Sequence, residues 1–237
     1  MAAPVKRVVA HSSLDTIRSN ELNGAMRDAL LDTAVDHFGR FGYEGAATRA
    51  IAAACGTAMS SITYHFGGKE GLYLAAAEHI GEQIHALHGP ALAAAQSDIK
   101  ASPVGDREDA IERLVQLLDR LAAMMLADRA AKWARFIIRE QQEPTEAFDR
   151  IYSIAMRPIV DCFIDLITVA RPDLDERARR ASGFLLFGQA LALRAGRASL
   201  CRVLGIERMD AEAEALMRAR LTAHTRCILS AAPETAR

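Results

Sequence analysis

The sequence contains little of what marks several common protein classes. Only 5% of its 237 residues are aromatic, and it has four cysteines, at positions 55, 162, 201 and 227. These cysteines are widely spaced and form no Cys-x-x-Cys pair. The spacing favours buried, reduced thiols over a disulfide framework or a zinc or redox site.

Long apolar runs and a charge excess are also missing. No run could cross a bilayer, and the opening residues, MAAPVKRVVAHSS, are too polar and too short for a signal peptide. We therefore expect a cytoplasmic protein without membrane contact. The net charge is −1, and the first 90 residues contain seven lysines and arginines against nine acidic residues. Any binding of nucleic acid must therefore come from a local surface.

The composition that remains indicates an all-α protein. Hydrophobic residues make up 51% of the chain, and strand-like alternation of β-branched residues is nearly absent. Apolar residues at steps of three and four predict a helix from about Asn23 to Phe41, ended by Gly42. Residues 1–22 lack such a period, so we expect a flexible arm; contact of its basic residues with DNA is the alternative.

Residues 48–72, TRAIAAACGTAMSSITYHFGGKEGL, carry the clearest functional signal. The pattern predicts a helix from Thr48 to Cys55, a turn at Gly56 and a second helix from Ala58 to His65. The second helix is polar on one side and has two apolar anchors, Ile62 and Phe66, that we expect in the core. A polar helix face held on an apolar scaffold suits the DNA major groove.

Residues 26–74 resemble the N-terminal DNA-binding domain of the TetR/AcrR family of transcriptional regulators. Many ordered positions make the resemblance specific. The sequence departs from the family pattern at Thr63, where a tyrosine is usual, and at Ala47, where a serine or threonine usually caps the helix. The matching residues are Phe38, Gly42, Tyr43, Thr48, Ile51, Ala52, Cys55, Gly56, His65, Phe66, Lys69, Glu70 and Leu72.

The resemblance implies an N-terminal three-helix helix-turn-helix domain, residues 23–72, followed by a C-terminal helical ligand-binding and dimerisation bundle, residues 73–237. For Arg49 the alternative is a solvated surface charge. Lys69 lies in the first turn of a helix, where a cation is unfavourable unless an anion such as a phosphate is near. The resemblance assigns contact with a DNA operator to Thr48, Arg49, Met59, Ser60, Ser61, Thr63, Tyr64, His65 and Lys69.

The helix that starts at Lys69 is expected to end near His88, before the breakers Gly89 and Pro90. Its histidines His79, His85 and His88 are expected at the surface; a metal site is the alternative, and we expect neither a metal nor a cofactor. Further along, Asp106, Asp175 and Asp210 are expected at helix starts, and Pro158 is expected to kink a long helix.

Methionine and aromatic residues of the middle region predict an adaptable pocket for an apolar or aromatic ligand. The alternative is that they are plain core. The run REQQEPTEAFDRIY resembles the ligand domain of the CerR/CecR-like branch of the family, which implies control of transport or drug-efflux genes. The predicted pocket residues are Met124, Met125, Trp133, Phe136, Tyr152 and Met156.

The last two helices, residues 175–195 and 210–231, carry apolar stripes. In the family, two such helices from each subunit form a four-helix bundle, so the resemblance implies a homodimer; the alternative is that the stripes cover the domain's own core. The whole predicts a ligand-responsive transcriptional regulator, in the simplest case a repressor that a small molecule releases from a palindromic operator.

Two other functions stay open from the sequence. One is an all-α small-molecule-binding protein or enzyme whose helix-turn-helix is vestigial, although the residues show no nucleophile–base pair, phosphate-cradling glycine loop or metal cluster. The other is a sequence-indifferent architectural DNA binder, which lacks the basic surface it would need.

Overall fold

The computed structural model describes residues 11–101 and 106–231. These residues form helices joined by turns and contain no strand, which confirms the all-α prediction. The chain divides into two compact units, Met1–Ala76 and Ala77–Arg237, and the division falls inside helix α4 (Lys69–Ala101). Across the described ranges, no helix is long and apolar enough to cross a membrane.

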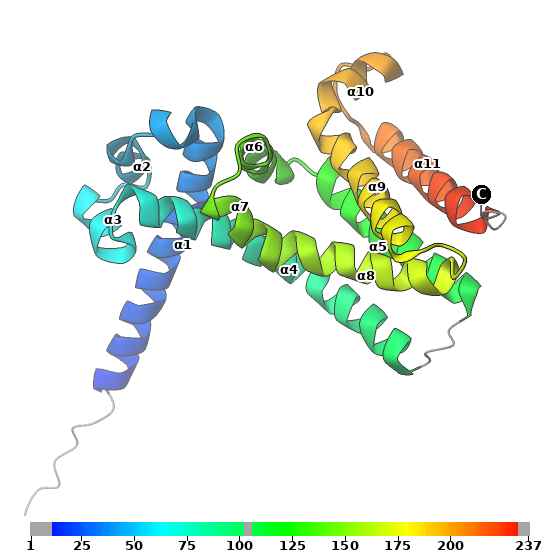
Figure 1. The fold of residues 1–237 in the computed structure, drawn as a ribbon. Helices are drawn as coiled ribbons and strands as arrows, with labels where there is room; N and C mark the ends of the chain where they lie inside the picture. The colour runs from blue at the N-terminus through cyan, green and yellow to red at the C-terminus, as the bar shows by residue number, and fades with distance from the viewer. Residues whose placement is uncertain (1–10, 102–105, 232–237) are drawn as a thin grey trace, which may run out of the picture. The chain divides into compact units, whose positions relative to one another are not determined.

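The N-terminal unit contains α1 (His11–Gly45), α2 (Thr48–Ala54), α3 (Met59–Phe66) and the first turns of α4 (Figure 1). The predicted start of the first helix near Asn23 is wrong, because α1 begins at His11. Residues 11–22 contain neither glycine nor proline, so a helix can extend through them without an amphipathic period. Residues 1–10 of the predicted arm lie outside the described residues.

Glycines set the turns of this unit. Gly42 interrupts α1 with φ 72° and ψ 177°, and Gly56 takes φ 65° in the turn between α2 and α3. Residues with a branched or bulky side chain rarely adopt a backbone conformation with positive φ. The core between the helices includes Phe38, Ile51 and Ile62, each no more than 1% exposed. Phe66, which was expected in the core, is only half-buried.

Helix α4 runs through Gly89 and Pro90 to Ala101, so its predicted end near His88 is wrong. Proline inside a helix removes one hydrogen bond and costs about 3 kcal/mol. The residues that follow, ALAAAQ at 91–96, have strong helix propensity, and Leu92 and Ala95 are buried. This burial and propensity offset the cost of Pro90.

The C-terminal unit is built around α5 (Arg107–Leu126), which packs against α8 (Arg157–Ala170), α9 (Glu176–Ala195) and α11 (Ala211–Ser230). Eleven of its twenty residues are buried, so α5 is covered on most sides. The remaining helices are α6 (Ala130–Gln142), α7 (Glu146–Ile151) and α10 (Arg197–Leu204).

A π-helical turn, η1 (Tyr152–Met156), joins α7 directly to α8. Pro158 lies in the first turn of α8 and has no N–H group to donate to the carbonyl group of Ile154. The wider π turn lies directly before this gap in the hydrogen-bond ladder. The π turn and α8 form one continuous helical segment, and the kink expected at Pro158 stays a prediction.

Local capping follows the sequence closely. The carboxylates of Asp106, Asp175 and Asp210 accept hydrogen bonds from the backbone N–H groups of the first turns of α5, α9 and α11. Each cap satisfies a donor that the helix leaves unpaired. The three predicted helix starts are confirmed.

All four cysteines are free thiols, as predicted. Cys162 and Cys201 are buried, whereas Cys55 is half-buried and Cys227 is exposed, so burial holds for two of the four. Burial, and to a lesser degree the charge of Asp165, raises the pKa of the Cys162 thiol to about 11. This thiol stays protonated and unreactive at neutral pH.

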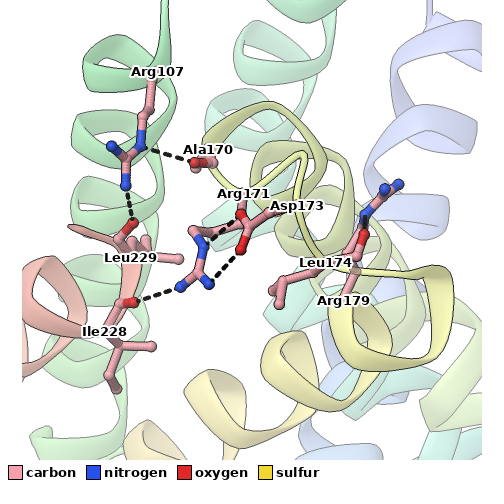
Figure 2. Close-up of polar contacts among 8 residues, drawn as sticks. All are labelled: Arg107, Ala170, Arg171, Asp173, Leu174, Arg179, Ile228 and Leu229. Atoms are coloured by element: carbon pink, nitrogen blue, oxygen red, sulfur yellow. Dashed lines mark hydrogen bonds and ion pairs between the residues drawn. The ribbon is translucent and has the colours of Figure 1, made fainter. Parts of the chain in front are cut away.

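Arginine side chains donate hydrogen bonds to backbone carbonyl groups at the ends of α8 and α11 (Figure 2). Arg107 donates from Nε to the carbonyl oxygen of Ala170 at 3.0 Å and from Nη2 to that of Leu229 at 2.9 Å. Arg171, which is buried, donates to the carbonyl oxygen of Ile228 at 3.2 Å and binds both carboxylate oxygens of Asp173. These bonds connect the start of α5 to the C-terminal ends of α8 and α11.

Gly81 provides a test of the packing between α4 and η1. A Cβ atom at Gly81 would lie 2.9 Å from Cβ of Ile154, which is closer than side chains approach one another. We expect Gly81→Ala to lower the free energy of unfolding by about 1–3 kcal/mol through overpacking. Denaturant unfolding at fixed protein concentration measures this change.

Gly24→Ala is the matched control, because a Cβ atom at Gly24 of α1 meets no atom within 4 Å. It should stabilise the protein by about 0.5–1 kcal/mol through helix propensity alone. Equal stabilisation by both substitutions would contradict the close contact at Gly81.

Candidate nucleic-acid interface and internal cavity

Helix α3 presents a continuous outer face. Met59, Ser60, Thr63 and Tyr64 are exposed, and Tyr64 is 85% exposed. Ser60, Thr63 and Tyr64 follow Met59 by one, four and five positions, which places all of them on one side of an α-helix. Ile62 lies on the opposite side and is 1% exposed. The buried isoleucine thus fixes the helix with its predicted DNA-contacting side chains at the surface.

The other predicted contact residues of this segment are partly enclosed. The hydroxyl of Ser61 hydrogen-bonds with that of Thr57 at 2.9 Å, and both Ser61 and His65 are half-buried. The His65 ring packs edge-on against Tyr64, with ring centroids 4.9 Å apart. These contacts orient the outer face.

The start of α2 has no side-chain cap. Its N-cap residue is Ala47, and no side chain accepts a hydrogen bond there. Thr48, which follows, is half-buried, and Arg49 is exposed. The absence of the serine or threonine that usually caps this helix is therefore not compensated by Thr48.

Two cations are held near the C-terminal end of α3. The Arg27 guanidinium lies 5.9 Å from the centroid of the Phe66 ring. Lys69 donates from Nζ to the carbonyl oxygen of Glu44 at 3.1 Å and lies 4.8 Å from the centroid of the Tyr43 ring. The carbonyl and the ring explain why a lysine is tolerated in the first turn of α4. An ammonium group has three donors, so Lys69 retains donors for an anion.

The C-terminal unit contains a cavity of about 380 Å³ whose walls come mainly from α5, α6, η1 and α9. Of the predicted pocket residues, Met124, Met125, Trp133 and Met156 line it. Phe136 and Tyr152 do not line it, which corrects that part of the prediction. Phe136 faces the core of the unit, and Tyr152 is partly exposed and stacks on Phe148.

Sequence reasoning missed the wall contributed by α9 and α4. Phe187, Gly188 and Leu191 of α9 line the cavity, as does Ile84 of α4. The α9 residues belong to stripes that were assigned to a subunit interface. Their apolar and small character was visible, but only the packing of α6 against α9 shows which side faces the cavity.

One end of the cavity is bordered by cations. Arg194, a lining residue, donates from Nε to the carbonyl oxygen of Met125 at 2.7 Å and from Nη2 to that of Ala127. Arg197 donates to the carbonyl oxygen of Leu126 at 2.7 Å. Burial, and then the charge of Arg197, lowers the pKa of Arg194, while Asp128 acts in the opposite direction.

Two histidines of α4 are buried, although the sequence predicted surface positions. His79 pairs with Gln83 at 2.7 Å, and Nε2 of His88 lies 3.3 Å from the sulfur atom of Met124. His85 is exposed, as predicted. Within residues 11–101 and 106–231, no group of His, Cys, Asp and Glu side chains is arranged to hold a metal ion.

Comparison with known proteins identifies the family. Residues 30–76 match the sequence model of the bacterial regulatory proteins of the TetR family. Residues 110–232 match the C-terminal domain of the HTH-type transcriptional dual regulator CecR. CecR of Shigella flexneri is 30% identical over 201 residues, which cover 84% of this chain and 89% of CecR. The chain belongs to the TetR family of bacterial transcriptional regulators.

Solved structures of TetR-type regulators share the fold. A putative TetR-family regulator from Mesorhizobium loti has a TM-score of 0.59 at 16% identity and covers 88% of this chain and 96% of its own. AibR, solved with isovaleryl coenzyme A and operator DNA, has a TM-score of 0.60 at 16% identity. The match covers 84% of this chain and 97% of AibR. The family consists of transcriptional regulators and not of enzymes, so the chain is a transcriptional regulator of the TetR type.

His88 predicts a pH dependence of stability. Burial, followed by the charges of Arg120 and Arg129, lowers its pKa from the ordinary value of 6.5. As pH falls below 6.5, His88 takes up a proton in the unfolded chain before it does so in the folded chain. The free energy of unfolding therefore falls with pH until the pH passes the pKa of His88 in the folded protein. Unfolding free energies measured on both sides of pH 6.5 report this loss.

We expect His88→Gln to lose less stability than the wild type over that pH range. The exposed His85 supplies the control, and His85→Gln should follow the wild-type profile. Parallel profiles for all three proteins would show that His88 does not carry the effect.

Proposed function

We propose that the protein is a homodimer that binds an operator through α3 and is released from it by a small molecule bound in the C-terminal cavity. The observation that carries the proposal is the exposed face of Met59, Ser60, Thr63 and Tyr64, held outward by buried Ile62. A helix of this kind places its side chains against base edges in the major groove.

The proposed roles follow from the chemistry of the side chains. The hydroxyls of Ser60 and Thr63 can meet several base edges, and Met59 offers apolar contact to a thymine methyl group. None of them makes a two-pronged contact to a purine, so DNA shape and bridging water contribute to specificity. Thr48, Arg49 and Lys69 contact phosphates. Ser61 and His65 orient the contacting face.

A substitution of Tyr64 tests this interface. Tyr64→Ala should change the unfolding free energy by less than about 0.5 kcal/mol, because the side chain is exposed. It should weaken operator binding by about tenfold or more, since a lost base or phosphate contact costs about 1–3 kcal/mol. Fluorescence anisotropy measures the affinity on a duplex that the wild-type protein has selected from random-sequence DNA.

The control is Tyr152→Ala, which removes a partly exposed tyrosine from the C-terminal unit. It should leave the affinity for the same duplex unchanged. If Tyr64→Ala also binds like the wild type, α3 does not form the interface.

The proposed dimer surface lies on α9 and α11. Phe184 and Leu185 of α9 are 65% and 64% exposed, and Leu216 and Ile228 of α11 are also exposed. Large apolar side chains at this exposure favour burial against another protein surface. Two such helices from each subunit would form a four-helix bundle about a two-fold axis, matching a palindromic operator.

Phe184→Glu should convert the dimer into a folded monomer, because it would place a carboxylate in a desolvated interface. Light scattering after gel filtration measures the mass, and circular dichroism checks the fold. Val203→Glu is the control, since Val203 of α10 is 83% exposed but lies outside the two proposed helices. A dimer that persists in Phe184→Glu, or one lost equally in both variants, would contradict the proposed surface.

The proposed response to ligand acts through α4. Ile84 of α4 lines the cavity, and His88 contacts Met124, another lining residue. Gly81 lies against Ile154, which directly precedes the lining residues Ala155 and Met156. A molecule in the cavity therefore touches α4 and the elements packed on it, and α4 continues into the DNA-binding unit.

A ligand acts on operator binding only if it binds the released conformation more tightly than the DNA-bound one. A difference of a few kcal/mol in binding free energy is sufficient. We include transport or efflux genes as expected targets on the strength of the CecR-like C-terminal domain alone. Binding to chromosomal DNA places the proposed activity in the cytoplasm.

A further inference from the structure

The cavity is elongated along α6. Seven residues of one face of this helix line it, from Ala130 at the first position to Gln142 at the last. At 1.5 Å per residue this face extends over about 18 Å. A volume of about 380 Å³ accommodates about 15 non-hydrogen atoms, scaled from a 150 Å³ cavity that holds benzene. The space therefore suits a slender molecule of moderate size.

The two ends of the cavity differ chemically. Its walls are apolar apart from Gln141 and Gln142 at the C-terminal end of α6 and Arg194 of α9. Arg194 binds the last carbonyl groups of α5, and α5 is followed directly by Ala130 at the start of α6. The cation is therefore at the end of the cavity away from the two amides.

Positive charge accumulates at the Arg194 end. Arg194 and Arg197 bind the neutral carbonyl groups of Met125, Leu126 and Ala127, which leaves both charges in place. Asp128, which contacts Arg197 at 3.3 Å, is itself 97% exposed and screened by water. Burial is the main cause of the lowered pKa of Arg194, and the positive charge of Arg197 adds to it.

His88 is also subject to nearby positive charges. His88 contacts the lining residue Met124, and its pKa is lowered by burial and then by Arg120 and Arg129. Arg120 of α5 and Arg129 of the following turn thus act on His88, and Arg197 of α10 acts on Arg194. A carboxylate placed beside Arg194 would balance this charge and accept charge-assisted hydrogen bonds.

We propose that the cavity takes an elongated amphipathic monocarboxylate, with its apolar tail along α6 and its carboxylate paired with Arg194. The inference rests on the proposed function in treating this cavity as the effector site. It adds the chemical class of the effector, a chain or slender ring system that carries one anionic end.

Trp133 makes the test direct, because it is the only tryptophan of the chain and lines the cavity. Titration with decanoate and with decanol, which share the same tail, is followed by tryptophan fluorescence and by calorimetry. Decanoate should bind at least about tenfold more tightly than decanol, as expected for hydrogen bonds to a charged group. Equal or tighter binding of decanol would overturn the proposal.

Variants identify the cation. Arg194→Gln should remove the preference for decanoate and leave decanol binding within about threefold of the wild type, since the tail contacts are retained. Arg197→Gln is the matched control, because Arg197 binds the same helix end but does not line the cavity. An equal loss of both ligands in Arg194→Gln would show that Arg194 only caps α5. If that variant does not fold, the wild-type comparison of the two ligands decides.

Operator binding is measured in parallel to separate the two proposals. Operator binding without affinity for decanoate overturns the ligand class and leaves the proposed regulator intact. Selective decanoate binding without operator binding upholds the ligand class and overturns the proposed function.

Discussion

Buried helix ends require partners for their carbonyl groups, and the C-terminal unit depends on arginines to supply them. A helix leaves its last four carbonyl groups without intrahelical donors, and burial without a partner is costly. Arg194 and Arg197 bind the end of α5, while Arg107 and Arg171 bind the ends of α8 and α11. The last four carbonyl groups of the central helix α5 therefore have hydrogen-bond partners although the helix is enclosed on most sides.

The same solution has an electrostatic consequence. Carbonyl groups supply hydrogen bonds but no full negative charge, so the bonds from Arg194 to the carbonyl groups of Met125 and Ala127 leave the charge of Arg194 in place. At the end of α5 this charge borders an apolar cavity, where the low dielectric strengthens its effect on any bound anion. A structural requirement of the helix ends thus creates the chemical asymmetry of the cavity. In the DNA-binding unit, Lys69 and Arg27 are held by aromatic rings, which keeps cations beside α3 although the first 90 residues contain more acidic than basic side chains.

Features set by a few neighbouring residues could be predicted from the sequence. The aspartate caps, the turn at Gly56 and the inward position of Ile62 depend on local spacing, and all three are present. Features set by distant packing could not be predicted. The passage of α4 through Pro90 depends on burial of its later residues, and the burial of His88 depends on contact with Met124 of α5. The position of Phe136 outside the cavity likewise depends on which side of α6 meets α9.

In the proposed function, two copies of α3 read one stretch of DNA. Footprinting of the intact protein on the DNA upstream of its own gene tests it most directly. We expect two protected half-sites of related, inverted sequence, with centres about one helical turn or a multiple of it apart. Protection that is uniform along the duplex, or a single isolated half-site bound by one protomer, would contradict it.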